Sequence, residues 1–174
     1  MATAVVLPGR RYGHAQAGLR LTELALEEAG YDLVRVEWPE TGMPEDAAGA
    51  AAAVADIAGP LLDDAPAYVV AKSLGTFAAP LAAERGLPAV WLTPLLSEPV
   101  CRDGVLANPA RQLLVGGEDD FAWDGAVAQD AVARGATAVV LPGADHGFEV
   151  GTDAVASAET LVGLARAVRG FLAS

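Results

Sequence analysis

A serine at the end of an apolar run is the residue of this sequence best placed to do chemistry. The run AYVV at 67–70 leads into AKSLG at 71–75, and a helical pattern follows. The small residues Ala71 and Gly75, two positions before and after Ser73, allow a sharp turn from strand to helix, in which the serine is held in a strained conformation with its side chain exposed. The spacing therefore predicts a nucleophile. The simpler interpretation is a serine that caps the helix.

A nucleophilic serine needs two partners. Its hydroxyl is unreactive at neutral pH without a base, and the base needs an acid to orient it. Of the two histidines, His146 follows an apolar run and precedes the last helical stretch, whereas His14 lies near the amino end. Between Ser73 and His146, another apolar run leads into GGEDD at 116–120. Serine, carboxylate and histidine thus each follow a predicted strand, and the carboxyl ends of parallel strands share one edge of a sheet.

Strands and helices are predicted to alternate along the chain, which is typical of a parallel sheet with helical crossovers. The expected strands lie near 2–7, 32–38, 67–72, 89–93, 111–116 and 137–141, and the expected helices near 15–29, 45–58, 74–85, 123–134 and 154–172. Most of these strands are continuously apolar and so buried on both faces, whereas 33–38 alternates apolar and charged residues as an edge strand does. The prediction is one α/β domain, 1–174, built as a three-layer α/β/α sandwich.

The order Ser, Asp, His, the serine turn, the Gly-x-x-Asp turn and the Asp-His-Gly loop together resemble a small α/β hydrolase, of the lidless esterase or dienelactone-hydrolase kind. The resemblance covers nearly the whole chain. It implies a minimal core with a mainly parallel six-stranded sheet, in which 33–38 becomes the edge because two leading strands of larger relatives are missing. It also implies that 95–110 holds a loop and one short helix in place of a lid.

Residue by residue, the resemblance implies Ser73 as the nucleophile, His146 as the base and Asp120, third after Gly117, as the acid. Ala71 departs from the family pattern, because the motif usually begins with glycine. The carboxylates that compete with Asp120 are Glu118, Asp119 and Asp124.

The same family builds an oxyanion hole from two backbone N–H groups. One would come from Leu74, the residue after the nucleophile. The other would come from the loop at 8–13, which lacks the His-Gly found at this point in many relatives, so that Arg10 and Arg11 both stay open as donors.

These roles predict a serine hydrolase that cleaves a small ester, thioester or lactone through an acyl-enzyme on Ser73. Residues in the loops at the same edge are candidates to bind the substrate, and the aromatic ones are equally consistent with a cap over the core. They are Arg11, Tyr12, Phe121, Trp123 and Phe148. Two alternatives stay open: a lyase, isomerase or cyclase on the same fold, and a non-catalytic doubly wound binding module.

Other reactive residues have simpler interpretations. Lys72 is expected to be a surface charge beside the turn, and His14 a surface histidine at a helix start. Asp145 is expected to be exposed, since neighbouring side chains diverge, and the single cysteine, Cys101, to be buried packing.

Composition narrows the classes of partner. A net charge of -12 opposes binding to nucleic acid or to anionic lipid. No stretch is apolar enough to cross a bilayer, and the amino end has apolar residues before Arg10, the reverse of a signal peptide. No metal cluster and no phosphate-binding glycine motif is present, so no cofactor is implied. We therefore expect a cytoplasmic monomer or homodimer that acts on a small acyl substrate.

Overall fold

The computed structural model of the protein describes residues 2–174. Within them, six parallel strands form one sheet in the order β2-β1-β3-β4-β5-β6. The strands are β1 (Thr3–Leu7), β2 (Asp32–Arg35), β3 (Tyr68–Lys72), β4 (Ala89–Leu92), β5 (Gln112–Gly117) and β6 (Thr137–Leu141). The helices are α1 (Ala17–Glu28), α2 (Ala47–Asp63), the 3₁₀ helix η1 (Ser73–Ala78), α3 (Ala79–Arg85), α4 (Pro99–Ala107), α5 (Gly125–Ala133) and α6 (Ala154–Leu172).

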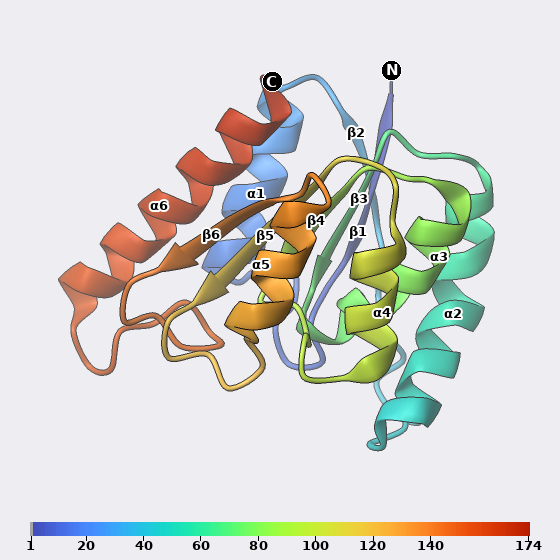
Figure 1. The fold of residues 1–174 in the computed structure, drawn as a ribbon, viewed down its shortest axis with the longest axis horizontal. Coiled ribbons are helices and arrows are strands. Elements are labelled where there is room, and N and C mark those ends of the chain that lie inside the picture. The colour runs from blue at the N-terminus through green and yellow to red at the C-terminus, as the bar shows by residue number, and fades with distance from the viewer. Residues whose placement is uncertain (1) are drawn as a thin grey trace.

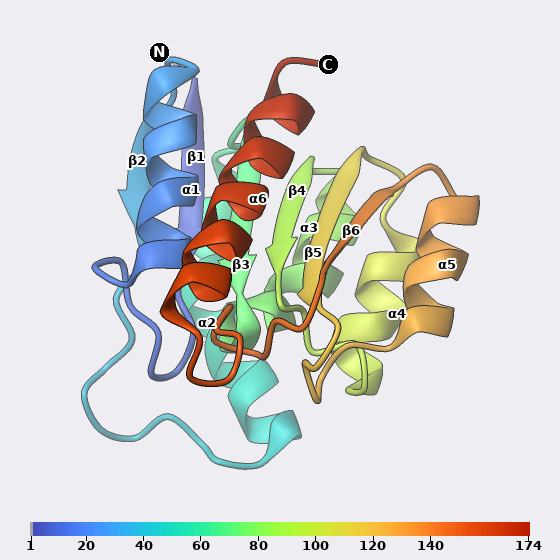
Figure 2. The same cartoon turned by 90° about the vertical axis from the view of Figure 1, so that its left-hand side faces the viewer.

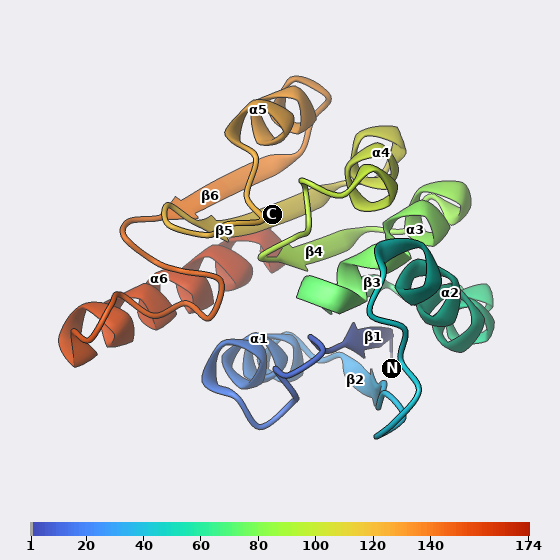
Figure 3. The ribbon, with the colours of Figure 1, turned by 90° about the horizontal axis from the view of Figure 1, so that it is seen from below.

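The elements form three layers (Figures 1 and 2). Helices α1 and α6 cover one face of the sheet, and α2, α3, α4 and α5 cover the other, as the view from below in Figure 3 makes plain. The predicted α/β/α sandwich with a six-stranded sheet is therefore confirmed.

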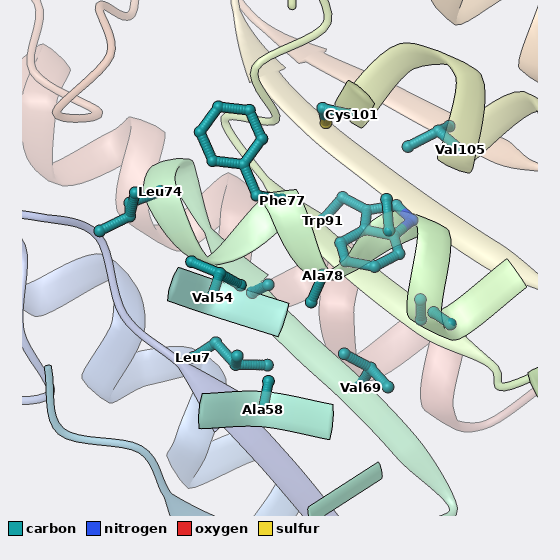
Figure 4. Close-up of a cluster of buried hydrophobic side chains, with 14 of the residues drawn as sticks. Leu7, Val54, Ala58, Val69, Leu74, Phe77, Ala78, Trp91, Cys101 and Val105 are labelled. Atoms are coloured by element: carbon teal, nitrogen blue, oxygen red, sulfur yellow. The ribbon is translucent and has the colours of Figure 1, made fainter. Parts of the chain in front are cut away.

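The layer between the sheet and α2 to α5 holds the larger part of the core. Leu7 and Val69 from the sheet meet Val54 and Ala58 of α2, and Trp91 lies among η1, α3 and α4 (Figure 4). Trp91 is fully buried, yet its indole N–H is satisfied because Gln112 Oε1 accepts it at 2.7 Å. Cys101 is fully buried in the same layer, as predicted.

The strand β2 lies at one edge of the sheet, as its alternating pattern predicted. It is shorter than expected and ends at Arg35, although the Val36 N–H still donates to the Val6 carbonyl at 2.9 Å. Beyond it the chain turns across the end of β1, where the indole of Trp38 donates to the Pro8 carbonyl. The predicted strand residues 36–38 therefore form the start of a loop.

Two helices differ from the predicted ones at a proline. Helix α2 continues through Pro60 to Asp63, although proline removes one helical hydrogen bond. Pro60 faces solvent and Leu62 in the same turn is fully buried, so packing of the last turn offsets the lost bond. The predicted helix 74–85 begins as η1, and Pro80 in the first turn of α3 marks the change to α-helix.

The segment expected to replace a lid contains one helix, α4, which begins at Pro99. It packs so closely on α3 that a Cβ at Gly104 would lie 2.5 Å from the backbone nitrogen of Pro80. No helix within residues 2–174 is both long and apolar enough to span a membrane.

The close approach of α3 and α4 predicts opposite effects for two helical glycines. Gly104→Ala should lower the free energy of unfolding by about 1–3 kcal/mol, because the new methyl group meets backbone atoms that cannot move aside. Gly170→Ala in α6, where nothing lies within 4 Å of the added Cβ, should raise it by about 0.5–1 kcal/mol. Urea unfolding measures both, and equal effects of the two substitutions would contradict the packing described.

Candidate active site

Ser73 occupies a sharp turn at the carboxyl end of β3. Its φ is 49°, in the left-handed region that costs an L-residue about 1–2 kcal/mol. The turn packs directly against β1, since a Cβ at Gly75 would lie 2.7 Å from the carbonyl oxygen of Leu7. Glycine at 75 is therefore required for the turn to sit on the sheet, and the serine side chain stays partly exposed at the sheet edge.

His146 lies in the loop between β6 and α6, which is held by its own hydrogen bonds. The Oδ1 atom of Asp145 accepts from the backbone N–H groups of Gly147, at 2.7 Å, and Glu149, at 2.9 Å. The buried side chain of Phe148 anchors the loop on the core, and its backbone has a φ of 69°. Asp145 itself is exposed, as predicted. The imidazole is thereby held at the end of the loop that faces β3.

Asp120 comes from a tight turn just after β5. The turn lies against the histidine loop, because a Cβ at Gly117 would lie 2.0 Å from the carbonyl oxygen of Ala144. The Asp120 side chain is fully buried, and its Oδ1 accepts from the Ala122 N–H at 3.0 Å. A hydrogen bond within its own turn therefore helps to orient the carboxylate toward the histidine.

The three side chains form one hydrogen-bonded chain. Asp120 Oδ1 lies 2.7 Å from His146 Nδ1, and His146 Nε2 lies 2.8 Å from Ser73 Oγ. Because an ionised carboxylate only accepts, the Nδ1 atom carries the proton and the Nε2 atom is left to accept from the serine hydroxyl. This order of donors and acceptors suits removal of a proton from Ser73.

The carboxylates that competed with Asp120 lie elsewhere. Glu118 accepts from the Gly143 N–H at 3.0 Å, and Asp124 caps α5 by accepting from Ala126 and Val127. Asp119 is exposed. Asp120 alone among these four bonds the imidazole.

A small pocket of about 220 Å³ opens beside Ser73. Leu74, Phe77, Leu95 and Phe121 contribute apolar surface to it. A larger hollow of about 440 Å³ lies among Ala2, Leu61 and Pro66 at the amino ends of the strands, far from the hydrogen-bonded chain. We regard the smaller one as the candidate substrate site, because it contains a reactive group.

No family model matches the sequence, and no curated protein is significantly similar to it. Solved structures do resemble the fold. The esterase Est1E from Butyrivibrio proteoclasticus superposes with a TM-score of 0.73 at 13% identity, over 99% of this chain and 87% of that one. A putative hydrolase of the α/β superfamily from Xanthomonas campestris has a TM-score of 0.67 at 17% identity, over 99% of both chains. A monoacylglycerol lipase from Paleococcus ferrophilus has a TM-score of 0.67 at 14% identity, over 97% of this chain and 94% of that one.

The chain has the α/β-hydrolase fold. At these identities the likeness shows the fold alone, and it agrees with the resemblance inferred from the sequence.

In this hydrolase fold, the loop after β1 lies next to the serine turn. A Cβ at Gly9 would be 3.5 Å from the Cβ of Ser73. The guanidinium of Arg10 donates to the carbonyl oxygens of Met43 and Pro44, which ties this loop to the segment before α2. The backbone N–H groups of Leu74, Arg10 and Arg11, the predicted oxyanion donors, make no loop or turn hydrogen bond within residues 2–174, so Arg10 and Arg11 both stay open as the second donor.

Of the predicted substrate-binding residues, Phe121 is the one that lines the pocket. The residue is 79% exposed, and the centroid of its ring lies 4.6 Å from that of the His146 ring. The others do not line this pocket: Arg11 is exposed outside it, Trp123 packs over Gly116, and Phe148 is buried beside Tyr12 under α1. Their aromatic rings belong to the core, the alternative that the sequence had left open.

Lys72 and His14 differ from their simple interpretations. Lys72 is fully buried instead of lying on the surface. His14 is mostly buried, with Nδ1 2.6 Å from Glu23 Oε1 and Nε2 2.8 Å from the Val36 carbonyl, and it is not part of the serine site. The sequence signal for Lys72 was a lysine inside an otherwise apolar strand. Within residues 2–174, no group of three or more His, Cys, Asp or Glu side chains is placed to hold a metal ion.

The left-handed backbone of Ser73 makes a prediction about stability. Ser73→Gly should have a free energy of unfolding about 1 kcal/mol higher than Ser73→Ala, because only alanine retains a Cβ at positive φ. Neither variant has the hydroxyl, so the comparison isolates the backbone. At Ser97, which is not in the left-handed region, the glycine variant should be the less stable of the two. Thermal or urea unfolding tests the pair, and a less stable glycine variant at 73 would exclude a strained turn.

Proposed function

We propose that the protein is a serine hydrolase that cleaves small carboxylic esters, thioesters or lactones through an acyl-enzyme on Ser73. The observation that carries the proposal is the hydrogen-bonded chain from Asp120 through His146 to Ser73, with heavy-atom distances of 2.7 and 2.8 Å. These distances lie within the range in which a positioned base can take a proton from a nucleophile. The esterases and hydrolases among the similar folds support the same class of reaction.

In the first half of the reaction, Ser73 Oγ attacks the substrate carbonyl while His146 Nε2 takes the hydroxyl proton. The Asp120 carboxylate stabilises the imidazolium that forms and keeps the ring oriented. The tetrahedral intermediate then collapses, His146 returns its proton to the leaving alcohol or thiol, and the acyl group stays on Ser73.

In the second half, a water molecule attacks the acyl-enzyme. His146 takes a proton from the water and then returns it to Ser73 Oγ, which releases the acid and restores the site. The chain of hydrogen bonds is the same in both halves, so one arrangement of three side chains serves both steps.

The negative oxygen that develops in each half needs donors that are already in place. We assign this role to the backbone N–H groups of Leu74, which follows the nucleophile, and Arg10, in the loop tied down by its own guanidinium. Removing one such donor from a comparable site costs about 3–4 kcal/mol of transition-state stabilisation.

The size of the pocket limits the substrate. At about 220 Å³ it is smaller than the ~300–1,000 Å³ typical of sites for drug-sized ligands. Phe121 forms an exposed apolar edge beside the histidine. We therefore assign small acyl groups as substrates.

The proposal predicts covalent labelling of one residue. A fluorophosphonate probe should label the folded protein with a stoichiometry of about one, and Ser73→Ala should abolish labelling, because only an activated serine attacks the phosphorus. His146→Ala should slow labelling severely. Intact-mass spectrometry measures the adduct. Folded wild-type protein that takes no label would favour a non-catalytic binding module, and label with no turnover of short-chain p-nitrophenyl esters would favour a different carbonyl chemistry on the same serine.

The acid can be tested with a neighbouring control. Asp120→Ala should lower kcat for a short-chain p-nitrophenyl ester by roughly 10³- to 10⁴-fold, because the imidazole loses the carboxylate that orients it. Asp119→Ala, next in the chain but exposed, should leave kcat within about twofold. Steady-state kinetics on both variants decides the assignment, and similar losses at 119 and 120 would refute it.

A further inference from the structure

A lysine is buried directly behind the proposed nucleophile. Lys72 is the last residue of β3 and is fully buried, a state that lysine almost never adopts without partners. Its Nζ lies 4.5 Å from the ring centroid of Tyr12 and 4.8 Å from that of Phe148, so two aromatic faces enclose the ammonium. Neither half of the proposed reaction uses this ammonium.

The ammonium joins three segments at the carboxyl edge of the sheet. Its Nζ donates to Thr93 Oγ1 at 2.5 Å and to the backbone carbonyl of His146 at 2.7 Å. Thr93 follows β4, and His146 belongs to the loop after β6. The end of β3 is thereby bonded to the residue that carries the base, 74 positions later in the chain.

Backbone strain gathers around the same ammonium. Thr93 has a φ of 40°, a genuine outlier for a β-branched residue, and Ser73, next to Lys72, has a φ of 49°. Such conformations persist only where the surroundings hold them. A buried ammonium that bonds the Thr93 hydroxyl is one such constraint.

Burial and the nearby carboxylates shift the pKa of Lys72 in opposite directions. Burial is the largest effect and lowers the pKa of Lys72 from 10.5 to about 7, while the nearby carboxylates of Asp120 and Asp145 raise it. The other groups that face it are the Tyr12 phenol, whose pKa is raised mainly by burial and which stays neutral, the Thr93 hydroxyl and the Phe148 ring. The ammonium is therefore held in place by a few strong contacts and loses its charge readily.

We propose that Lys72 is a positioning residue, whose buried ammonium holds the backbone of His146 against the end of β3 and so keeps the imidazole aligned with the Ser73 hydroxyl. This inference rests on the proposed hydrolase function. Lys72 acts through His146 and does not touch the substrate.

The proposal makes the rate depend on pH in a definite direction. As pH rises through about 7, Lys72 loses its proton and its charge-assisted bond to the His146 carbonyl weakens. The kcat of the wild-type protein should therefore decline on the alkaline side. Stability should move the other way: between pH about 7 and 10.5 the unfolded chain binds more protons at this residue, so the free energy of unfolding rises with pH.

The test replaces the ammonium with a side chain of similar length. Lys72→Met should lower kcat for a short-chain p-nitrophenyl ester by roughly 10- to 100-fold with KM changed less than about twofold, the loss expected when a reacting group is displaced. The same variant should lose the alkaline decline in kcat and the rise of stability with pH. Wild-type kcat in Lys72→Met, or an alkaline decline that persists in it, would overturn the proposal.

A second pair of variants covers the case in which Lys72→Met does not fold. Thr93→Val removes one hydroxyl partner and should lower kcat by a smaller factor than Lys72→Met, whereas Thr93→Ser keeps the hydroxyl and should retain kcat. Equal kcat in the valine and serine variants would overturn the positioning role of Lys72. Fluorophosphonate labelling separates the two claims: no label on the folded wild-type protein overturns the hydrolase function and this role together, while normal labelling with an unchanged Lys72→Met overturns only the role of Lys72.

Discussion

The hydrogen bond between His146 Nε2 and Ser73 Oγ is the contact on which the account depends. His146 belongs to the loop after β6 and Ser73 to the turn directly after β3, and two further strands separate β3 and β6 in the sheet. Because β3 and β6 are parallel strands of one sheet, the segments that follow them lie at the same edge. Gly75 lets the serine turn pack on β1, and Gly117 lets the acid turn pack on the histidine loop, since a Cβ at either glycine would collide with a neighbouring backbone.

Strain in the backbone is concentrated at this edge. Within residues 2–174, four residues other than glycine have positive φ, and three of them, Ser73, Thr93 and Phe148, follow β3, β4 and β6 in the neighbourhood of the lysine ammonium. These conformations lower the free energy of unfolding, but they hold side chains in one orientation, which a base and a nucleophile require. The buried ammonium of Lys72 is the physical link between these strained positions.

The sequence predicted what depends on local pattern and on strand order. Apolar runs located the six strands, and the residues just after three of them supplied the serine, carboxylate and histidine that the structure brings together. It missed what depends on tertiary packing. The burial of Lys72 follows from which loops pack together, and periodicity does not record that. For the same reason the sequence left open whether Trp123 and Phe148 bind substrate or cap the core. The passage of α2 through Pro60 likewise depends on the burial of Leu62.

The most direct test is the structure of the protein after inactivation by diethyl p-nitrophenyl phosphate. The account predicts a phosphorus atom bonded to Ser73 Oγ, with a phosphoryl oxygen about 2.7–3.1 Å from the backbone nitrogens of Leu74 and Arg10. It also predicts that the imidazole of His146 remains bonded to Asp120. Phosphorylation of a different residue, or a phosphoryl oxygen that points away from both nitrogens, would contradict it.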